Sequence, residues 1–372
     1  MMQPNNNYSA WSTPQYTHTQ FSALSPTERL RYFCQLAHLA PSTHNTQPWK
    51  FHIDPDNMVI EVSLDQNSVL PASDVAGRQS IISIGAAIEH IRIGAEYEGY
   101  AVTIHSASAD KTSVRPVPKD PQHVSRVPIA TIALSPQMNA PSHAESGRAG
   151  AIFSRKIMRA EYKRDQPIPN HVLEEIQSCV DTDTITFHTL TDPLRRQAIA
   201  EFQAQADGFV INNKKFSREL GDWLLENDTS SPVGMPGAGF GLDDTQAMRM
   251  HRALSGDIPL EPEDGLRFSL AGKEYIEKTP FIGVITTKGD TVDDWIHAGR
   301  AFERIALTFE SHGISHAMHA GIVEVRLINR MFAATLGTLQ SLQVLFRAGY
   351  VKKEEDLRRP HSPRLPLEAV LY

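Results

Sequence analysis

Residues 40–49, APSTHNTQPW, hold the side chains best suited to bind a polar ligand. Hydroxyl and amide groups dominate this stretch, and prolines restrict its backbone at both ends. Ser42 and Asn45 can therefore present hydrogen-bonding groups to a ligand from a restricted loop. The same residues could instead form a turn whose polar groups are satisfied within the protein, and the residues alone leave both interpretations open.

Other motifs argue against several kinds of site. Residues 237–241 read G-x-G-x-G, not the G-x-G-x-x-G of a dinucleotide-binding loop. His316 and His319 could ligate a metal ion, but no spacing supplies a third ligand, so we predict no metal site. No G-x-S-x-G elbow or catalytic triad is evident. The sequence thus offers no catalytic residue of its own, which favours a bound cofactor as the source of the chemistry.

Composition narrows the class of protein. The chain has 372 residues with a formal net charge of -7, which is not the charge of a general nucleic-acid binder. No apolar stretch is long enough to span a membrane. Cys34 and Cys179 lie in apolar stretches, which predicts two buried free thiols in a reducing cytoplasm. Residues 1–24 form a polar tail without a signal peptide, expected to be disordered or laid over a partner surface.

Helices and strands are expected on both sides of the loop. Ser25, Pro26 and Glu28 form a helix start, and that helix must end before Pro41. Residues 136–150 are rich in Pro, Ser, Ala and Gly and predict a linker. The remaining predicted elements are strands at 49–53, 58–62, 102–104, 129–133 and 184–190, and helices at 79–97 and 167–180.

The chain shows signs of an internal repeat. Residues 85–100 align with residues 299–314 with six identities in sixteen positions. The offset between the halves grows along the chain, which predicts an insertion in the second half at about residues 215–275. Within it, residues 230–241 are rich in Gly and Pro. Their apolar members, Met235 and Phe240, could cover a pocket, or the segment could be a surface connection.

Taken together, the motifs resemble the nitroreductase family of FMN enzymes. APSTHNTQPW is similar to that family's A-P-S-x-x-N-x-Q-P-W motif. Residues 155–159, RKIMR, are similar to its R-R-S-x-R flavin motif, and residues 363–368, PRLPLE, to its C-terminal sequence. Residues 74–78 followed by the 85–99 helix look like the double-length branch of mycobacterial Acg-type NAD(P)H nitroreductases.

This resemblance implies an α+β fold in two tandem halves that mimic the usual homodimer. The expected halves are residues 25–140 and 150–372, the second carrying the insertion. The A-P-S-x-x-N loop occurs in the first half alone, and the basic motif in the second alone. One chain would therefore build a single complete flavin site between its halves, and the other site would have degenerated.

The resemblance also implies residue roles. Arg155 and Arg364 would pair with the FMN phosphate, although a charge run such as residues 155–164 is more often a solvated helix face. Arg159 would face the flavin pyrimidine and favour the reduced flavin, and the chain near Ala320 would pass the flavin N5. The residues implied to bind FMN are Pro41, Ser42, Thr43, His44, Asn45, Gln47, Arg155, Lys156, Arg159, His319, Ala320, Gly321 and Arg364.

The expected function is FMN-dependent transfer of electrons from NAD(P)H to a nitro compound, quinone or similar small-molecule acceptor, in a monomer or homodimer. Two departures from the family pattern bear on it. Ile157 replaces a Ser or Thr and removes one hydrogen bond to the cofactor, and Ala320 stands where many relatives have Glu. The alternatives are a protein that sequesters FMN beneath a closed lid without turnover, and an interaction protein with a relict site.

Overall fold

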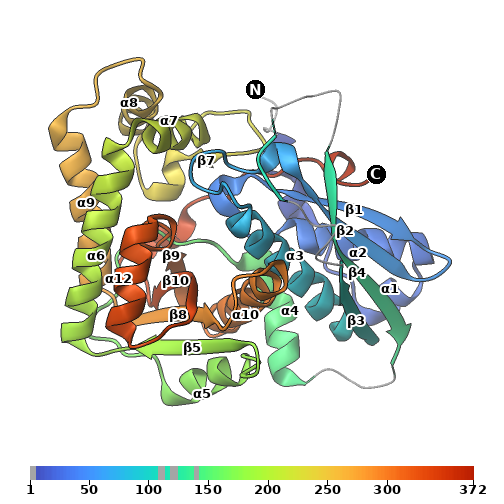
Figure 1. The fold of residues 1–372 in the computed structure, drawn as a ribbon. Helices are drawn as coiled ribbons and strands as arrows, with labels where there is room; N and C mark the ends of the chain where they lie inside the picture. The colour runs from blue at the N-terminus through green and yellow to red at the C-terminus, as the bar shows by residue number, and fades with distance from the viewer. Residues whose placement is uncertain (1–5, 108–113, 118–124, 138–141) are drawn as a thin grey trace.

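The computed structural model describes residues 6–107, 114–117, 125–137 and 142–372. Its described part contains two four-stranded antiparallel sheets, one from each half of the chain (Figure 1). The first has the order β1-β2-β4-β3 and the second the order β5-β8-β10-β9. In each sheet the strands therefore follow the same path, because the third strand in chain order lies at the edge beyond the fourth.

The strands agree with the prediction of an α+β fold. The first sheet consists of β1 Trp49–Asp54, β2 Val59–Asp65, β3 Tyr100–Ser106 and β4 Arg126–Pro136. The second consists of β5 Ile185–Leu190, β8 Phe281–Thr287, β9 Ser315–Met318 and β10 Ser341–Gly349. Strand β8 is buried along its whole length because sheet neighbours flank it and helices cover it.

Two long helices pack between the sheets, α3 Arg78–Tyr97 and α10 Val292–Ser311 (Figure 1). They cross at Gly85 and Gly299. A Cβ atom on Gly299 would lie 2.0 Å from the carbonyl oxygen of Ile82 and 3.0 Å from the Cα of Gly85. The two backbones can approach this closely only because neither residue has a side chain, so these glycines set the contact between the halves.

Charged residues at matching positions of α3 and α10 are buried at this contact. Glu303 lies 2.8 Å from Nε2 of His90 and 3.0 Å from Nε of Arg155. Glu89, which aligns with Glu303 in the predicted repeat, pairs instead with Arg300 and with the neighbouring arginines Arg92 and Arg304. Each glutamate thus has a partner from the opposite half, His90 for Glu303 and Arg304 for Glu89, and both glutamates are fully buried.

Four helices separate β5 from β8, where the first half has only a short turn between β1 and β2. These are α6 Pro193–Asn212, α7 Lys214–Trp223, α8 Asp244–Ser255 and α9 Pro262–Glu277. The expected insertion at 215–275 lies within this segment, but the helical part begins earlier, at Pro193. Short strands β6 Leu224–Leu225 and β7 Met235–Pro236 lie at its inner side.

The remaining helices surround the two sheets. Helix α2 Pro26–His38 begins at the predicted capping box, with the Glu28 carboxylate accepting from the Ser25 N–H at 2.7 Å. The others are α1 His18–Ser22, α4 His143–Ser154, α5 Asn170–Ser178, α11 Gly321–Glu324 and α12 Arg326–Leu336. Of the expected linker at 136–150, residues 138–141 lie outside the described part. From His143 on, the chain is helical because Ser142 caps a run of Ala, Glu and Arg.

The first residues also differ from the expectation of a disordered or partner-bound tail. Residues 6–12 form a 3₁₀ turn that packs against this chain's own C-terminal segment. The Trp11 indole stacks on His361 with ring centroids 3.9 Å apart, because an aromatic ring gains more from packing than from exposure. Both cysteines are buried free thiols, as predicted.

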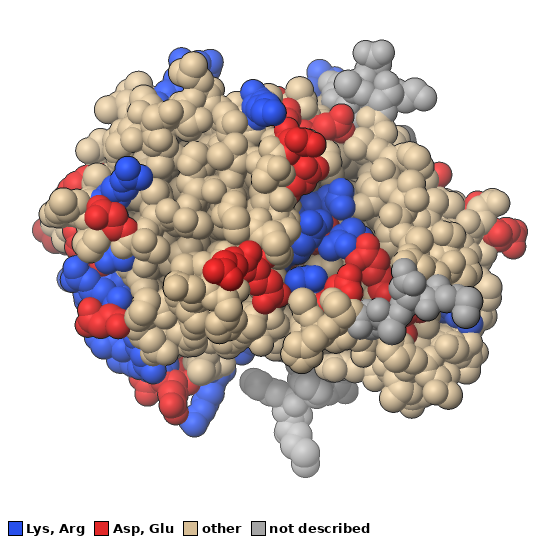
Figure 2. Space-filling view, turned by 90° about the horizontal axis from the view of Figure 1, so that it is seen from below, with Lys and Arg blue, Asp and Glu red and all other residues tan. Residues whose placement is uncertain are grey.

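Surface charge is mixed on the face seen from below. Basic and acidic side chains lie close together there, with a basic group in a central hollow flanked by acidic residues (Figure 2). This face therefore offers no continuous basic field of the kind that binds nucleic acid. Across the described residues, no helix combines the length and the apolar character needed to cross a bilayer.

Candidate flavin site between the halves

The loop before β1 has an unusual backbone. His44, Asn45 and Gln47 all have positive φ angles, of 44°, 57° and 51°. Such angles cost free energy for residues with a Cβ, so surrounding contacts must hold the loop in place. Asn45 donates to the carbonyl oxygens of Gly234 and Pro363, and Gln47 donates to that of Pro232. The loop is therefore fixed from both sides by later parts of the chain.

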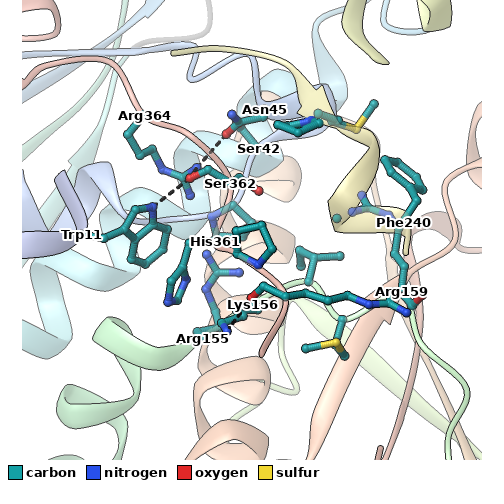
Figure 3. A pocket seen from close by; sticks show the side chains of 18 residues that line it. Trp11, Ser42, Asn45, Arg155, Lys156, Arg159, Phe240, His361, Ser362 and Arg364 are labelled. Carbon is teal, nitrogen blue, oxygen red and sulfur yellow. Dashed lines mark hydrogen bonds between the residues drawn. The ribbon is translucent and has the colours of Figure 1, made fainter. Parts of the chain in front are cut away.

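Next to this loop lies a cavity with two neighbouring parts. The first, which we call the basic chamber, has a volume of about 750 Å³, including space open to solvent. Its cationic lining comes from Arg155, Lys156, Arg159, Arg359 and Arg364 (Figure 3). Trp11 and His361 close one side of it.

The second part, which we call the apolar chamber, has a volume of about 840 Å³, again including open space. Apolar side chains such as Ile82, Phe302 and Val344 line much of it. The two chambers share five lining residues, which are Pro41, Ser42, Ile157, Arg159 and Met235. They are therefore neighbouring spaces with a common wall, and residues from both halves of the chain line them.

The structure brings most of the predicted site residues to this cavity. Those that line it are Pro41, Ser42, Thr43, His44, Asn45, Arg155, Lys156, Arg159, His319, Ala320 and Arg364. Gln47 and Gly321 are not among the lining residues. Gln47 is buried and accepts from the Leu365 N–H at 2.9 Å. At Gly321 an added Cβ would lie 3.0 Å from Asp207, so this residue permits close packing against α6.

Arg364 corrects one predicted role. Its guanidinium is buried and donates to Asn45 Oδ1 and to five backbone carbonyl oxygens, at 2.8–3.4 Å. These contacts involve all three of its nitrogens and so occupy its five N–H groups. Arg364 therefore holds the loop and the C-terminal segment together, and its donors are not available to a phosphate.

Arg155 and Lys156 are partly engaged as well. Arg155 pairs with Glu303 and donates to the Leu39 carbonyl oxygen at 2.9 Å. Lys156 donates through Nζ to the carbonyl oxygens of Leu357 and Arg359, at 3.0 and 2.8 Å. Carbonyl oxygens leave the charge of Lys156 uncompensated, so the basic chamber keeps a positive potential that suits an anion.

Arg159 differs from the other cations. Its guanidinium lies 4.4 Å from the centre of the Phe240 ring and lines both chambers. In the described part of the chain it has no carboxylate partner within 4 Å. Burial, and then the nearby Arg347, lower the pKa of Arg159 to about 10. A half-buried cation without a counter-charge is costly, so Arg159 is poised to receive negative charge from a ligand.

Two histidines of the apolar chamber are neutral at physiological pH. Burial, and then Arg159, lower the pKa of His44 to about 4, and its Nδ1 has no partner among the described groups. Burial and Arg347 hold the pKa of His319 well below its ordinary value. His316 lies elsewhere, buried against Phe302. No group of three potential metal-ligating side chains occurs within the described ranges.

Residues 230–241 cover the cavity, and we call them the lid. Met235 lines both chambers, and Phe240 lines the basic one. The lid is fastened at Pro232 and Gly234 by the side chains of Gln47 and Asn45, and Asn7 donates to the carbonyl oxygens of Thr229 and Ser231. These hydrogen bonds hold the lid against the loop before β1 and against the first residues of the chain.

The lining residues that the sequence prediction missed include Trp11, Gln79, Glu324 and His361. Trp11 sits in a polar stretch with no helical or strand pattern. Its large apolar ring in that context was the one available sign that the stretch is packed. Gln79 and Glu324 lie on helices whose orientation only the tertiary structure reveals.

Comparison with known proteins shows that the chain is similar to proteins named as NAD(P)H nitroreductases. The chain is 24% identical to "Putative NAD(P)H nitroreductase acg" of Mycobacterium tuberculosis, over 93% of this chain and 96% of that protein. A second relative in that organism, also named as an NAD(P)H nitroreductase, is 25% identical over 92% of this chain. The resemblance to the Acg-like group is thus confirmed along nearly the whole chain. No family model matches it.

Solved structures give a weaker likeness. The FMN-dependent nitroreductase NfnB of Mycobacterium smegmatis, in complex with NADPH, has a TM-score of 0.39 and 13% identity, over 60% of this chain and 96% of that one. A nitroreductase of the same name from a Sphingopyxis strain has a TM-score of 0.40 and 17% identity, over 60% and 97%.

Proposed function

We propose that this protein is an FMN-dependent oxidoreductase that takes electrons from NAD(P)H and passes them to a nitro compound, a quinone or a similar acceptor. The observation that carries the proposal is the cavity itself. It sets a basic chamber beside an apolar one, and an unpaired guanidinium, Arg159, lines both. A flavin mononucleotide has a matching form, with an anionic phosphate at one end and an aromatic ring system at the other.

The residues present fit the cofactor. Lys156 and Arg155 would supply positive charge for the phosphate in the basic chamber. Arg159 would compensate negative charge on the ring, and its own lack of a counter-ion makes that contact favourable. His44 Nδ1, buried without a partner, would accept or donate a hydrogen bond to the ring edge. When bound, FMN supplies the hydride chemistry, accepting two electrons from NAD(P)H and giving them to the acceptor.

We also infer that the two halves arose from one repeated unit of the nitroreductase fold. Both sheets have the same strand order, both halves place a long helix after the second strand, and Gly85 meets Gly299 at the contact. Glu89 and Glu303 occupy matching positions there, but the Arg155 side chain reaches Glu303 alone. This asymmetry supports one flavin site per chain. The free thiols of Cys34 and Cys179 support a separate point, that the protein works in a reducing cytoplasm.

Two measurements test the proposal. Flavin released from purified protein should equal one FMN per chain, and anaerobic addition of NADPH or NADH should bleach the bound flavin. Two FMN per chain would refute a single site between the halves. A bound flavin that neither nucleotide reduces would refute the electron-transfer function.

A second function, sequestration of FMN without turnover, is favoured by the fastened lid. The lid buries apolar groups over the cavity, and NAD(P)H must displace it to approach the flavin. Replacing residues 232–241 with a short Gly-Ser bridge should accelerate flavin reduction in stopped-flow measurements if the lid limits access. No reduction in either protein, with FMN still bound, would leave sequestration as the function.

A further inference from the structure

Among the residues that line the two chambers, Glu324 bears the single carboxyl group. It lies at the end of helix α11 and lines the apolar chamber, near His319 and Ala320 in the chain. Every other ionisable side chain of the cavity lining is a lysine, an arginine or a histidine. An acid in this place needs a chemical explanation, because burying a carboxyl group costs more free energy than burying an apolar side chain.

A hydrogen-bond chain fixes the orientation of this carboxyl group. The Thr43 hydroxyl donates to Oε1 of Gln79 at 3.0 Å, and Nε2 of Gln79 donates to Oε1 of Glu324 at 3.1 Å. These hydrogen bonds run from the loop before β1, in the first half of the protein, to helix α11 in the second half. Because Oε1 of Glu324 accepts from an amide, a proton on this carboxyl group resides on Oε2, which is then able to donate.

The burial of Glu324 makes its protonated form accessible at neutral pH. Burial raises the pKa of Glu324 to about 7. Asp74 and Glu219 act in the same direction, whereas Gln79 and Arg78 oppose it. Asp207 on α6 also lies close enough for the charge of Glu324 to affect its titration. A group with a pKa near the working pH can both hold and release a proton efficiently.

We propose that Glu324 is the proton donor to the electron acceptor bound in the apolar chamber. The inference rests on the function proposed above. Reduction of a quinone to a hydroquinone takes a hydride and a proton. Reduction of a nitro group to a nitroso group takes the same two, and one nitro oxygen leaves as water. Bound reduced FMN would supply the hydride. The O–H bond of Glu324 breaks as a new O–H bond forms on the acceptor oxygen, and the carboxylate regains its proton from solvent.

The first test isolates the acceptor step. Flavin in the purified protein is reduced chemically with dithionite and then mixed with a benzoquinone in a stopped-flow instrument between pH 5 and 9. In the native protein the rate should be constant below about pH 7 and fall about tenfold per pH unit above it. Glu324→Gln should lower the rate about 100-fold at pH 6, because general acid catalysis contributes on that scale. The same variant should abolish the pH dependence of the rate.

Matched variants make the test specific. Asp207→Asn removes another buried carboxyl group, whose pKa burial also raises to about 7, but which does not line the cavity. It should keep the fall in rate with pH. Glu324→Asp retains an acid and should keep a pH dependence at a reduced rate, so the proposal stays testable if Glu324→Gln folds poorly.

A second readout does not depend on turnover. The infrared carbonyl band of protonated carboxylic acids should be present at pH 5.5 and vanish by pH 9. It should be weaker in Glu324→Gln, where the buried carboxyl groups of Asp207 and Asp74 account for what remains. An unchanged band in that variant, or a native pH profile for its acceptor step, would overturn the proposal. Failure of NAD(P)H to reduce the flavin in the native protein bears on the proposed function alone, because dithionite bypasses that step.

Discussion

Nη1 of Arg364 donates to Oδ1 of Asn45 across 2.8 Å, which joins the loop before β1 to a segment 319 residues later in the chain. The same amide side chain donates to Gly234 of the lid and to Pro363. Asn45 thus connects the loop, the lid and the C-terminal segment. The part of the site that resembles a ligand-binding motif is therefore also the part that holds the cavity together.

Arg364→Ala should destabilise the protein by about 3–5 kcal/mol in urea unfolding, because it leaves several buried acceptors without a donor. Any loss of FMN affinity should be matched for riboflavin, which lacks the phosphate. Arg358→Ala, at an exposed arginine, serves as the control and should leave the free energy of unfolding unchanged. A loss confined to FMN would show that Arg364 contacts the phosphate after all.

Arg159→Met, in contrast to Arg364→Ala, should change the bound flavin and leave the stability of the protein nearly unchanged. The guanidinium has no carboxylate partner among the described residues, so the flavin-free protein should change in stability by less than about 1 kcal/mol. The reduction potential of bound flavin should fall by about 30 mV or more, which corresponds to about 1.4 kcal/mol for a two-electron couple. Spectroscopic titration against a reference dye measures it. An unchanged potential would place Arg159 away from the flavin ring.

Gly299→Ala tests the contact between the halves. The new methyl group would overlap the carbonyl oxygen of Ile82, and neither backbone can move without disturbing a helix. We expect a loss of about 3 kcal/mol in the free energy of unfolding. Gly150→Ala is the matched control, because a Cβ at this exposed position in α4 meets no atom within 4 Å. It should stabilise the protein by about 0.5–1 kcal/mol.

His316 should make the protein sensitive to acid. Burial, and then Arg155, lower the pKa of His316 to about 3, against about 6.5 in an unfolded chain. Below pH 6.5 the unfolded chain therefore binds a proton that the folded protein excludes, and stability falls until about pH 3. In His316→Met the loss of stability between pH 7 and pH 5 should be smaller by about 2 kcal/mol.

Urea unfolding at the two pH values measures this difference. His105→Met changes an exposed histidine and should leave the pH dependence as it is in the native protein. An equal acid loss in the native protein and in His316→Met would mean that His316 is protonated in the folded state.

Sequence reasoning located the elements whose signals are local. The Ser25 capping box marks the start of α2, and the turn at residues 54–57 separates β1 from β2. Helix α4 was missed because its Ala- and Gly-containing sequence resembles a linker until its capping residue, Ser142, is considered. Local patterns also do not show where an insertion begins, which is why the insertion was predicted from residue 215 although the four helices begin at Pro193.

The candidate site was predicted in outline for a different reason. The loop around Ser42 and the basic residues near Arg155 have recognisable sequences, and the structure places them on one cavity. Whether an arginine is free or engaged depends on acceptors far away in the chain. That is why Arg364, whose acceptors include the carbonyl oxygens of His38 and Ala40, was assigned to the phosphate. The role of Trp11 depends in the same way on His361.

The contact of Trp11 with the segment around Ser362 has a consequence for biosynthesis. The indole donates to a carbonyl oxygen 351 residues later, so the two sides of the basic chamber are translated far apart in time. At ordinary elongation rates the gap is roughly 20–70 s. Until the later segment emerges from the ribosome, the nascent chain has no closed chamber. The FMN proposed for this chamber would then be acquired only after the segment around Ser362 has been synthesised.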